Sequence, residues 1–293
     1  MTWRVDREIA VLLGSGSRAL LLQVAHPKIA AAVVDHSRYR SDPLGRLRDT
    51  LNSIYGFAFN DMDGVDRIVQ HIYALHSRVH GQTPDGEPYS ALDAHLLLWV
   101  YATLIDSSLL AYETLVARLE PTERETYYTE FRRAGHVWSI PPEDFPETLA
   151  RLREWMASLI ASGEVHVTSQ GRQVGRYILE PPVWWLPPPA ALALRLLTVW
   201  LLPQPLRSGF GYSWDPRREK IVRSLAACSR IVVPRLPRAL RDLPLARAAD
   251  RRVRTLVTRD EGVAFQSDAA WQRRSGSPGG ARRTPSSRAG NLR

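Results

Sequence analysis

The chain has 293 residues, of which 44% are hydrophobic and 24% are charged, a composition typical of a globular protein with its own core. Its single cysteine, Cys228, excludes an intrachain disulfide, an iron–sulfur cluster held by cysteines and a thiolate zinc site, and it fits a reducing compartment. The net charge of +9 does not indicate a nucleic-acid-binding protein, because residues 269–293 hold six arginines, no Asp or Glu, and no groove-reading motif.

The N-terminal region predicts two short helices separated by a glycine-rich turn. Apolar residues at helical spacing indicate a helix over 6–13 and another over 17–25. The Gly-Ser-Gly-Ser stretch at 14–17 is expected to break the first helix and cap the second. A phosphate-binding loop is the less favoured interpretation, because no strand precedes this stretch and no Lys-Ser/Thr pair follows it.

Helical spacing continues through most of the remaining chain. Further helices are predicted at 27–37, 42–55, 61–80, 90–113, 121–136, 145–160, 189–202, 215–233 and 236–254. The stretch 90–113 is the most apolar of these and is expected to be the central helix. Residues 163–180 are ambiguous between a strand and a helix, and we favour the helix. The predicted fold is all-α: one multi-helix domain of about ten helices over 1–265, with a disordered Arg/Gly/Ser/Pro-rich tail over 266–293.

The segment 183–203 is the most membrane-like part of the sequence. Three consecutive prolines and Arg195 interrupt it below the length of about 20 residues that a transmembrane helix needs. Its tryptophans suit either the protein core or a helix lying on a membrane surface, and we favour the core over peripheral membrane contact. The beginning of the sequence has no secretion-signal pattern, so we expect a cytoplasmic protein.

Histidine and arginine are concentrated between positions 26 and 80. This region contains His26, His36, Arg46, His76 and His80, although the whole chain has only eight histidines. Such a density of imidazole and guanidinium groups on predicted helices indicates a buried cofactor, with an iron centre as the first hypothesis.

Two pairs in this region have the i,i+4 spacing that places side chains on one helical face. Arg46 and Thr50 form the first pair, and the leucines beside Arg46 predict that its guanidinium is partly buried and needs a carboxylate partner. His76 and His80 form the second, which is the spacing of two zinc ligands, although Ser77 stands where a zinc protease has Glu. A histidine on a helix is more often structural than a ligand, and that alternative stays open.

Asp106 is an acidic residue in the middle of the most apolar predicted helix. Burying an unpaired carboxylate is costly, so Asp106 is expected to pair with an arginine, and Arg46 is a candidate. A buried ion pair that stabilises the fold and a role at the site are both consistent with the sequence.

Several ordered motifs resemble one family. They read LLLQVAHP, VVDHSRYRSDPLGRL, HSRVHG, PDGEPYSALD, LLLWVYATLIDS, LLAYE and ERETYYTEFRR, and they cover roughly residues 5–250. Together they resemble the rubber oxygenases (latex-clearing proteins) and the oxygenase that cleaves a prenyl side chain in mycophenolic acid biosynthesis. The resemblance implies a helical, globin-like fold that binds haem b and uses dioxygen to cleave carbon–carbon double bonds.

The resemblance also assigns roles to individual residues. It implies that His76 is the axial ligand of the haem iron, oriented by an acceptor at its other ring nitrogen. Arg46 would neutralise a haem propionate or polarise oxygen, with Thr50 donating a hydrogen bond beside it. His26 would lie on the distal side or contact a propionate, and His36 is a weaker candidate. Asp106 would lie among the residues around the cofactor.

One position departs from the pattern of the resembling proteins, and it leaves retention of the cofactor open. Tyr101 stands where relatives have a histidine in the motif that reads WVHATL.

The sequence thus leads to three functional hypotheses. The first is a haem b-dependent oxygenase that takes dioxygen and a small hydrophobic, isoprenoid- or lipid-like substrate, with an unknown redox partner. The second is a non-haem metal enzyme using His76, His80 and a carboxylate such as Asp106. The third is a cofactor-free helical protein that binds a lipid or a partner through 183–203.

Overall fold

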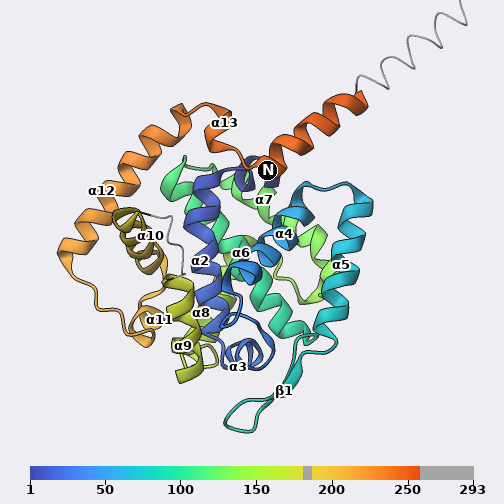
Figure 1. Ribbon diagram of the computed structural model, residues 1–293, viewed down its shortest axis with the longest axis vertical. Helices are drawn as coiled ribbons and strands as arrows, with labels where there is room; N and C mark the ends of the chain where they lie inside the picture. Colours follow the sequence, from blue (N-terminus) through green and yellow to red (C-terminus); the bar gives the residue numbers. More distant parts are fainter. Residues whose placement is uncertain (181–186, 258–293) are drawn as a thin grey trace, which may run out of the picture. The chain divides into compact units, whose positions relative to one another are not determined.

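The computed structural model describes residues 1–180 and 187–257 (Figure 1). The α-helices are α1 (Thr2–Asp6), α2 (Ile9–Val24), α3 (Pro27–His36), α4 (Pro43–Phe59), α5 (Met62–His76), α6 (Ala94–Leu115), α7 (Pro121–Ala134), α8 (Leu149–Ala161), α9 (Ser169–Leu179), α10 (Pro188–Leu201), α11 (Gln204–Gly209), α12 (Pro216–Val232) and α13 (Arg238–Arg241). Short 3-10 helices span Gly135–Trp138, Pro142–Asp144 and Val233–Arg235. A two-stranded antiparallel hairpin pairs β1 (His80–Gln82) with β2 (Pro88–Ser90). The predicted all-α fold is confirmed.

Helices α2 and α6 pack along each other at the centre of the fold (Figure 1). Leu21 and Leu22 of α2 and Ile105 and Leu109 of α6 are fully buried. The indole of Trp99, also fully buried, donates a 3.1 Å hydrogen bond to the carbonyl of Leu22. By length and composition α6 could cross a membrane, but most of it is buried inside the fold, as in the core helix of a soluble domain. In Figure 1 α5 and α12 lie at opposite edges of this central pair.

The predicted turn at 14–17 is wrong, because α2 runs through it without a break from Ile9 to Val24. The glycine at position 14 serves packing rather than a turn. A Cβ atom there would lie 2.7 Å from Cδ1 of Leu115 and 3.1 Å from Cβ of Ala111 on α6. The missing side chain therefore lets the two central helices approach closely. The need for glycine at position 14 comes from the side chains of α6 and not from the local sequence.

Three other helix boundaries differ from the prediction. Helix α5 ends at His76 rather than at residue 80, and the chain turns into the β-hairpin. Residues 163–168 are not helical, and Thr168 caps α9 by accepting a hydrogen bond from the amide of Gly171. The predicted helix at 236–254 is divided into α13 and a helical stretch at 244–257.

The chain divides into two units, Met1–Arg247 and Ala248–Arg293. Within the second unit, the described residues 248–257 are helical. The predicted domain boundary at 265 and the predicted tail at 266–293 lie outside the described residues. Residues 181–186 of the membrane-like segment lie outside them as well, whereas the second half of α10 packs against α2 and α12 with Leu197, Val199 and Leu201 buried.

A buried carboxyl group, Asp6, lies at the end of α1. The hydroxyl of Tyr127 donates a 2.9 Å hydrogen bond to it, and burial raises the pKa of Asp6 to about 7. In the unfolded chain an Asp loses its proton near pH 4. Between about pH 4 and pH 7 the folded protein therefore holds one proton more than the unfolded chain, and Asp6 makes folding less favourable as the pH rises.

We expect Asp6→Asn to remove this contribution to the pH dependence. The amide oxygen of Asn can still accept the hydrogen bond from Tyr127, but the side chain no longer ionises. The free energy of unfolding of the variant, relative to the parent, should increase by about 1.4 kcal/mol per pH unit between pH 5 and pH 7. Denaturant unfolding of both proteins at pH 5 and pH 8 measures this difference, and an equal difference at the two pH values would contradict it.

Candidate functional site

The inward face of α5 ends in His76. Val65 is buried and Ile68, Ile72 and His76 are half-buried, whereas most residues between them are exposed. This spacing of three to four residues makes one helical stripe, so His76 continues the apolar face that packs against the protein. Asp61 starts the helix by accepting a hydrogen bond from the amide of Gly64. The histidine is thus placed by the amphipathic pattern of α5 itself.

Arg46 and Thr50 share one face of α4, as their spacing predicts. The Arg46 guanidinium donates hydrogen bonds to the hydroxyl of Thr50 and, over 3.3 Å, to that of Ser37. The Thr50 hydroxyl in turn donates its proton to the carbonyl of Arg46 over 2.8 Å. Because a threonine hydroxyl has one proton to donate, Thr50 here orients Arg46 and does not offer a free donor as the resemblance implied.

The expectation that Arg46 is partly buried is confirmed only for its guanidinium, whose charge is disfavoured by burial. Its side chain is exposed, because the flanking Leu44 and Leu47 are themselves 44% and 38% exposed and do not cover it. The protein around the guanidinium nevertheless disfavours its charge and lowers its pKa. Arg46 is therefore reachable by solvent but flanked by protein, and its aliphatic neighbours are accessible as well.

Arg46 and His76 lie close enough to interact electrostatically. Asp61 lies at the join between the two packed helices α4 and α5. Arg46 stands fifteen residues before it, in α4, and His76 stands fifteen residues after it, at the end of α5. Burial lowers the pKa of His76, and the positive charge of Arg46 lowers it further. The imidazole is thus neutral at neutral pH. Among the described residues neither ring nitrogen of His76 has a hydrogen-bond partner, so the acceptor expected behind it is not in place there.

His26 belongs to a second group of side chains. It lies at the sharp bend between α2 and α3, where its Nδ1 accepts a 3.3 Å hydrogen bond from the amide of Lys28. Its Nε2 is buried and has no hydrogen-bond partner among the residues that the structure describes, and it lies 3.6 Å from a carboxylate oxygen of Glu164. The same oxygen lies 2.6 Å from Nε2 of His95. Burial lowers the pKa of His26 to about 4, so this ring is neutral.

The contacts of His26 lead to His95 and Glu164 and not to Arg46 or His76. Its predicted place beside the cofactor therefore stays a prediction. The weaker candidate His36 is exposed, with its Nε2 3.2 Å from the carbonyl of His80 and 3.3 Å from the hydroxyl of Tyr89. These contacts join α3 to the β-hairpin.

The predicted pairing of Asp106 with Arg46 is wrong. Asp106 accepts 2.8 Å hydrogen bonds from Arg18 of α2 and from Arg153 of α8. Arg18 also donates to the hydroxyl of Ser107 and to the carbonyl of Leu201, at 2.7 and 2.8 Å. Burial alone would raise the pKa of Asp106, but the two arginine charges outweigh it and lower the pKa. The group joins α2, α6, α8 and α10 as a buried ion-pair network.

The sequence contained a signal for this network that was missed. Arg18 is the only charged residue in the apolar stretch 9–25, and Asp106 is the only Asp, Glu, Lys or Arg in the apolar stretch 94–112. A lone cation and a lone anion in two apolar helices are natural partners, because each needs a buried counter-charge.

Tyr101, the departure from the resembling proteins, is a core residue. Its hydroxyl donates a 2.8 Å hydrogen bond to the carbonyl of Phe131, and its ring packs against Phe131 and Phe145. Burial raises its pKa, so the hydroxyl stays protonated. Tyr101 thus ties α6 to α7.

Comparison with known proteins identifies the family. A family model described as "ER-bound oxygenase mpaB/B'/Rubber oxygenase, catalytic domain" matches residues 3–231, which is most of the chain. No curated protein and no solved structure matches it, so the globin-like arrangement stays a prediction. The match confirms the resemblance found in the sequence motifs. The chain belongs to the family of mpaB and rubber oxygenase catalytic domains, and its domain is an oxygenase domain.

Proposed function

We propose that the protein is a haem b-dependent oxygenase in which His76 would hold the haem iron. The observation that carries the proposal is the state of His76: its ring is neutral, half-buried and free of hydrogen bonds among the described residues, and Arg46 lies nearby. A neutral imidazole with a free nitrogen is the form of histidine that binds iron. Membership of an oxygenase family supports the proposal independently.

The residues around His76 fit a porphyrin better than a bare metal ion. Within 1–180 and 187–257, no three His, Cys, Asp or Glu side chains are gathered as a protein-held metal ion requires. A metal bound through one histidine needs its other ligands from another molecule, and a porphyrin supplies four of them. Arg46 adds an accessible cation that suits a propionate, and Leu44 and Leu47 add exposed aliphatic surface for the macrocycle.

The non-haem alternative lacks a third ligand. His80 lies in β1 and is exposed, and Asp106 is held by Arg18 and Arg153. Removing Asp106 from those arginines would leave the buried Arg18 and the partly exposed Arg153 without this partner, at a cost of several kcal/mol. Haem with a single protein ligand is therefore the better account of these residues.

When bound, haem b supplies an iron at which dioxygen can be activated. The chain's own residues then have limited tasks. His76 would hold the iron, and Arg46, which Thr50 orients, would balance negative charge beside it. The substrate class, a small hydrophobic isoprenoid- or lipid-like molecule, rests on the resemblance, as does the need for dioxygen as co-substrate. The cytoplasmic location and the redox partner stay predictions.

The absorption spectrum and the haem and iron contents of the purified protein test the proposal. We expect a Soret band, about one haem b and one iron per chain, and oxygen uptake when an unsaturated hydrophobic compound is added. Bound iron or zinc without a Soret band would favour the non-haem enzyme. A folded protein that takes up neither haem nor metal would favour the cofactor-free interpretation and overturn the proposal.

A further inference from the structure

Helix α12 has two apolar faces, and the fold uses only one of them. On the inner face, Val222 and Ala226 are buried, and the hydroxyl of Ser229 donates a 2.9 Å hydrogen bond to the carbonyl of Leu115. These residues, spaced by four and three positions, attach α12 to the central helix α6. The inner face therefore accounts for the packing of α12.

The outer face carries a second stripe at helical spacing. Ile221, Leu225, Cys228 and Val232 follow one another at intervals of four, three and four residues, and all four are exposed. Ile221, Leu225 and Val232 expose 42%, 43% and 45% of their surface. A soluble helix normally presents polar residues on such a face, so this stripe is an unusual feature that calls for a partner.

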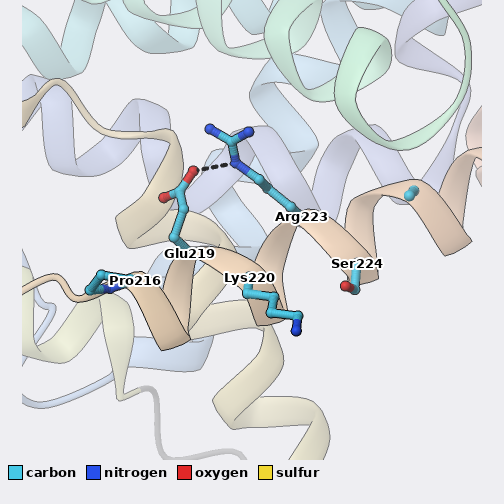
Figure 2. Close-up of a pocket in the computed structure, with 6 residues that line it drawn as sticks. Pro216, Glu219, Lys220, Arg223 and Ser224 are labelled. Atoms are coloured by element: carbon cyan, nitrogen blue, oxygen red, sulfur yellow. Dashed lines mark hydrogen bonds and ion pairs between the residues drawn. The ribbon is translucent and has the colours of Figure 1, made fainter.

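Positive charge accompanies the stripe. The chain has eight Arg and Lys residues between positions 216 and 241. Four of them pair with the carboxylates of Asp215, Glu219, Asp242 and Glu8, and the other four are Arg217, Lys220, Arg230 and Arg235. Figure 2 shows that Glu219 faces Arg223, its 2.6 Å partner, whereas Lys220 extends away from them. Arg217 and Lys220 line a shallow surface hollow together with Ile221 and Leu225 of the stripe. The outer face thus combines exposed aliphatic side chains with cations that its own acidic residue does not balance.

We propose that this outer face of α12 docks on a lipid bilayer with anionic headgroups. A basic amphipathic helix binds such a surface by placing its aliphatic stripe among the acyl chains and its cations among the phosphates. Leu236 and Leu240, which follow α12 in the chain, are exposed as well, the latter to 65%. The proposal rests on these exposed residues and does not depend on haem or on the reaction.

Other partners fit this face less well. In a symmetric pair of chains the same face would meet itself, which would gather Arg217 and Lys220 of both copies in one interface, where Glu219 is already paired with Arg223. A nucleic acid would satisfy the cations but offers no apolar surface for Ile221 and Leu225. An anionic bilayer supplies both kinds of contact.

The position of Cys228 allows a direct test with the full chain. It is the only cysteine, it is exposed, and it lies within the outer stripe, so an environment-sensitive thiol-reactive dye would report on this face without any substitution. We expect blue-shifted emission and co-sedimentation with vesicles of phosphatidylcholine and phosphatidylserine. Phosphatidylcholine alone should give neither, and added salt should weaken the association because it screens the cations.

A matched pair of variants separates this face from the rest of the molecule. Leu225→Ser combined with Lys220→Glu removes one aliphatic group and reverses one charge of the outer face, and we expect vesicle binding at least tenfold weaker. Met62→Ser combined with Arg67→Glu makes the same changes on the exposed side of α5 and should leave binding unchanged. Equal binding by all three proteins, which would point to the basic residues of 269–293, would overturn the proposal. The absence of vesicle binding would also overturn the proposal. A dimer in sedimentation that becomes a monomer in Leu225→Ser/Lys220→Glu would overturn it as well.

Discussion

His76→Ala is expected to abolish haem binding while leaving the protein folded. The bound haem b should fall from about one per chain to less than a tenth of that. Oxygen uptake should drop by about 100-fold or more, since loss of residues that merely support a metal ligand already costs 10- to 100-fold. The fold should tolerate the change, because His76 is half-buried at the very end of α5 and its side chain makes no hydrogen bond to other described residues.

Two matched substitutions control for general effects on this helix and on the turn after it. His71→Ala removes an exposed histidine of α5 itself, and His80→Ala removes the second member of the i,i+4 pair. Both should retain haem and oxygen uptake within about twofold of the parent. Haem content lost in His80→Ala but retained in His76→Ala would assign the ligand to the hairpin instead.

Asp106→Ala is expected to give the largest loss of stability. Removing one partner of a buried ion pair leaves uncompensated charge, here on Arg18 and, at the edge of the network, on Arg153, which typically costs about 3–5 kcal/mol. The free energy of unfolding from denaturant titration measures this loss. Glu154→Ala on α8, which breaks an exposed pair with Arg151, should cost no more than about 1 kcal/mol.

The same network predicts a pH dependence. Because the pKa of Asp106 is lowered in the folded protein, its stabilising contribution is present above about pH 4, where the unfolded Asp is ionised, and is lost as the pH falls through the folded value. The loss caused by Asp106→Ala should therefore shrink in acid. A loss below about 1 kcal/mol at neutral pH would contradict the structural role assigned to the network. A haem content that falls while the variant remains folded would instead place Asp106 among the residues around the cofactor.

The helical fold could be predicted because its elements are marked locally. The Asp42-Pro43 pair predicted the start of α4, and Asp42 does cap that helix by accepting from the amide of Gly45. The apolar run around Asp106 predicted the central helix α6. By contrast, the continuity of α2 through Gly14 could not be read locally, because the reason for a glycine there is the side chain of Leu115 on another helix.

The candidate site was predictable in part for the same reason. The i,i+4 spacing predicted that Arg46 and Thr50 interact, since that spacing is a property of one helix. The partners of Asp106 were not predictable from spacing, because Arg18 and Arg153 lie 88 and 47 residues away in the chain. Likewise, the contact of His26 with Glu164 depends on how the α2–α3 bend packs against the segment before α9.

The central claim is a bond between the imidazole of His76 and haem iron, and resonance Raman spectroscopy of the reduced protein tests it most directly. We predict an iron–histidine stretching band in the parent protein, no such band in His76→Gly mixed with haem, and a band when free imidazole is added to that mixture. A band that persists unchanged in His76→Gly would show that another residue holds the iron.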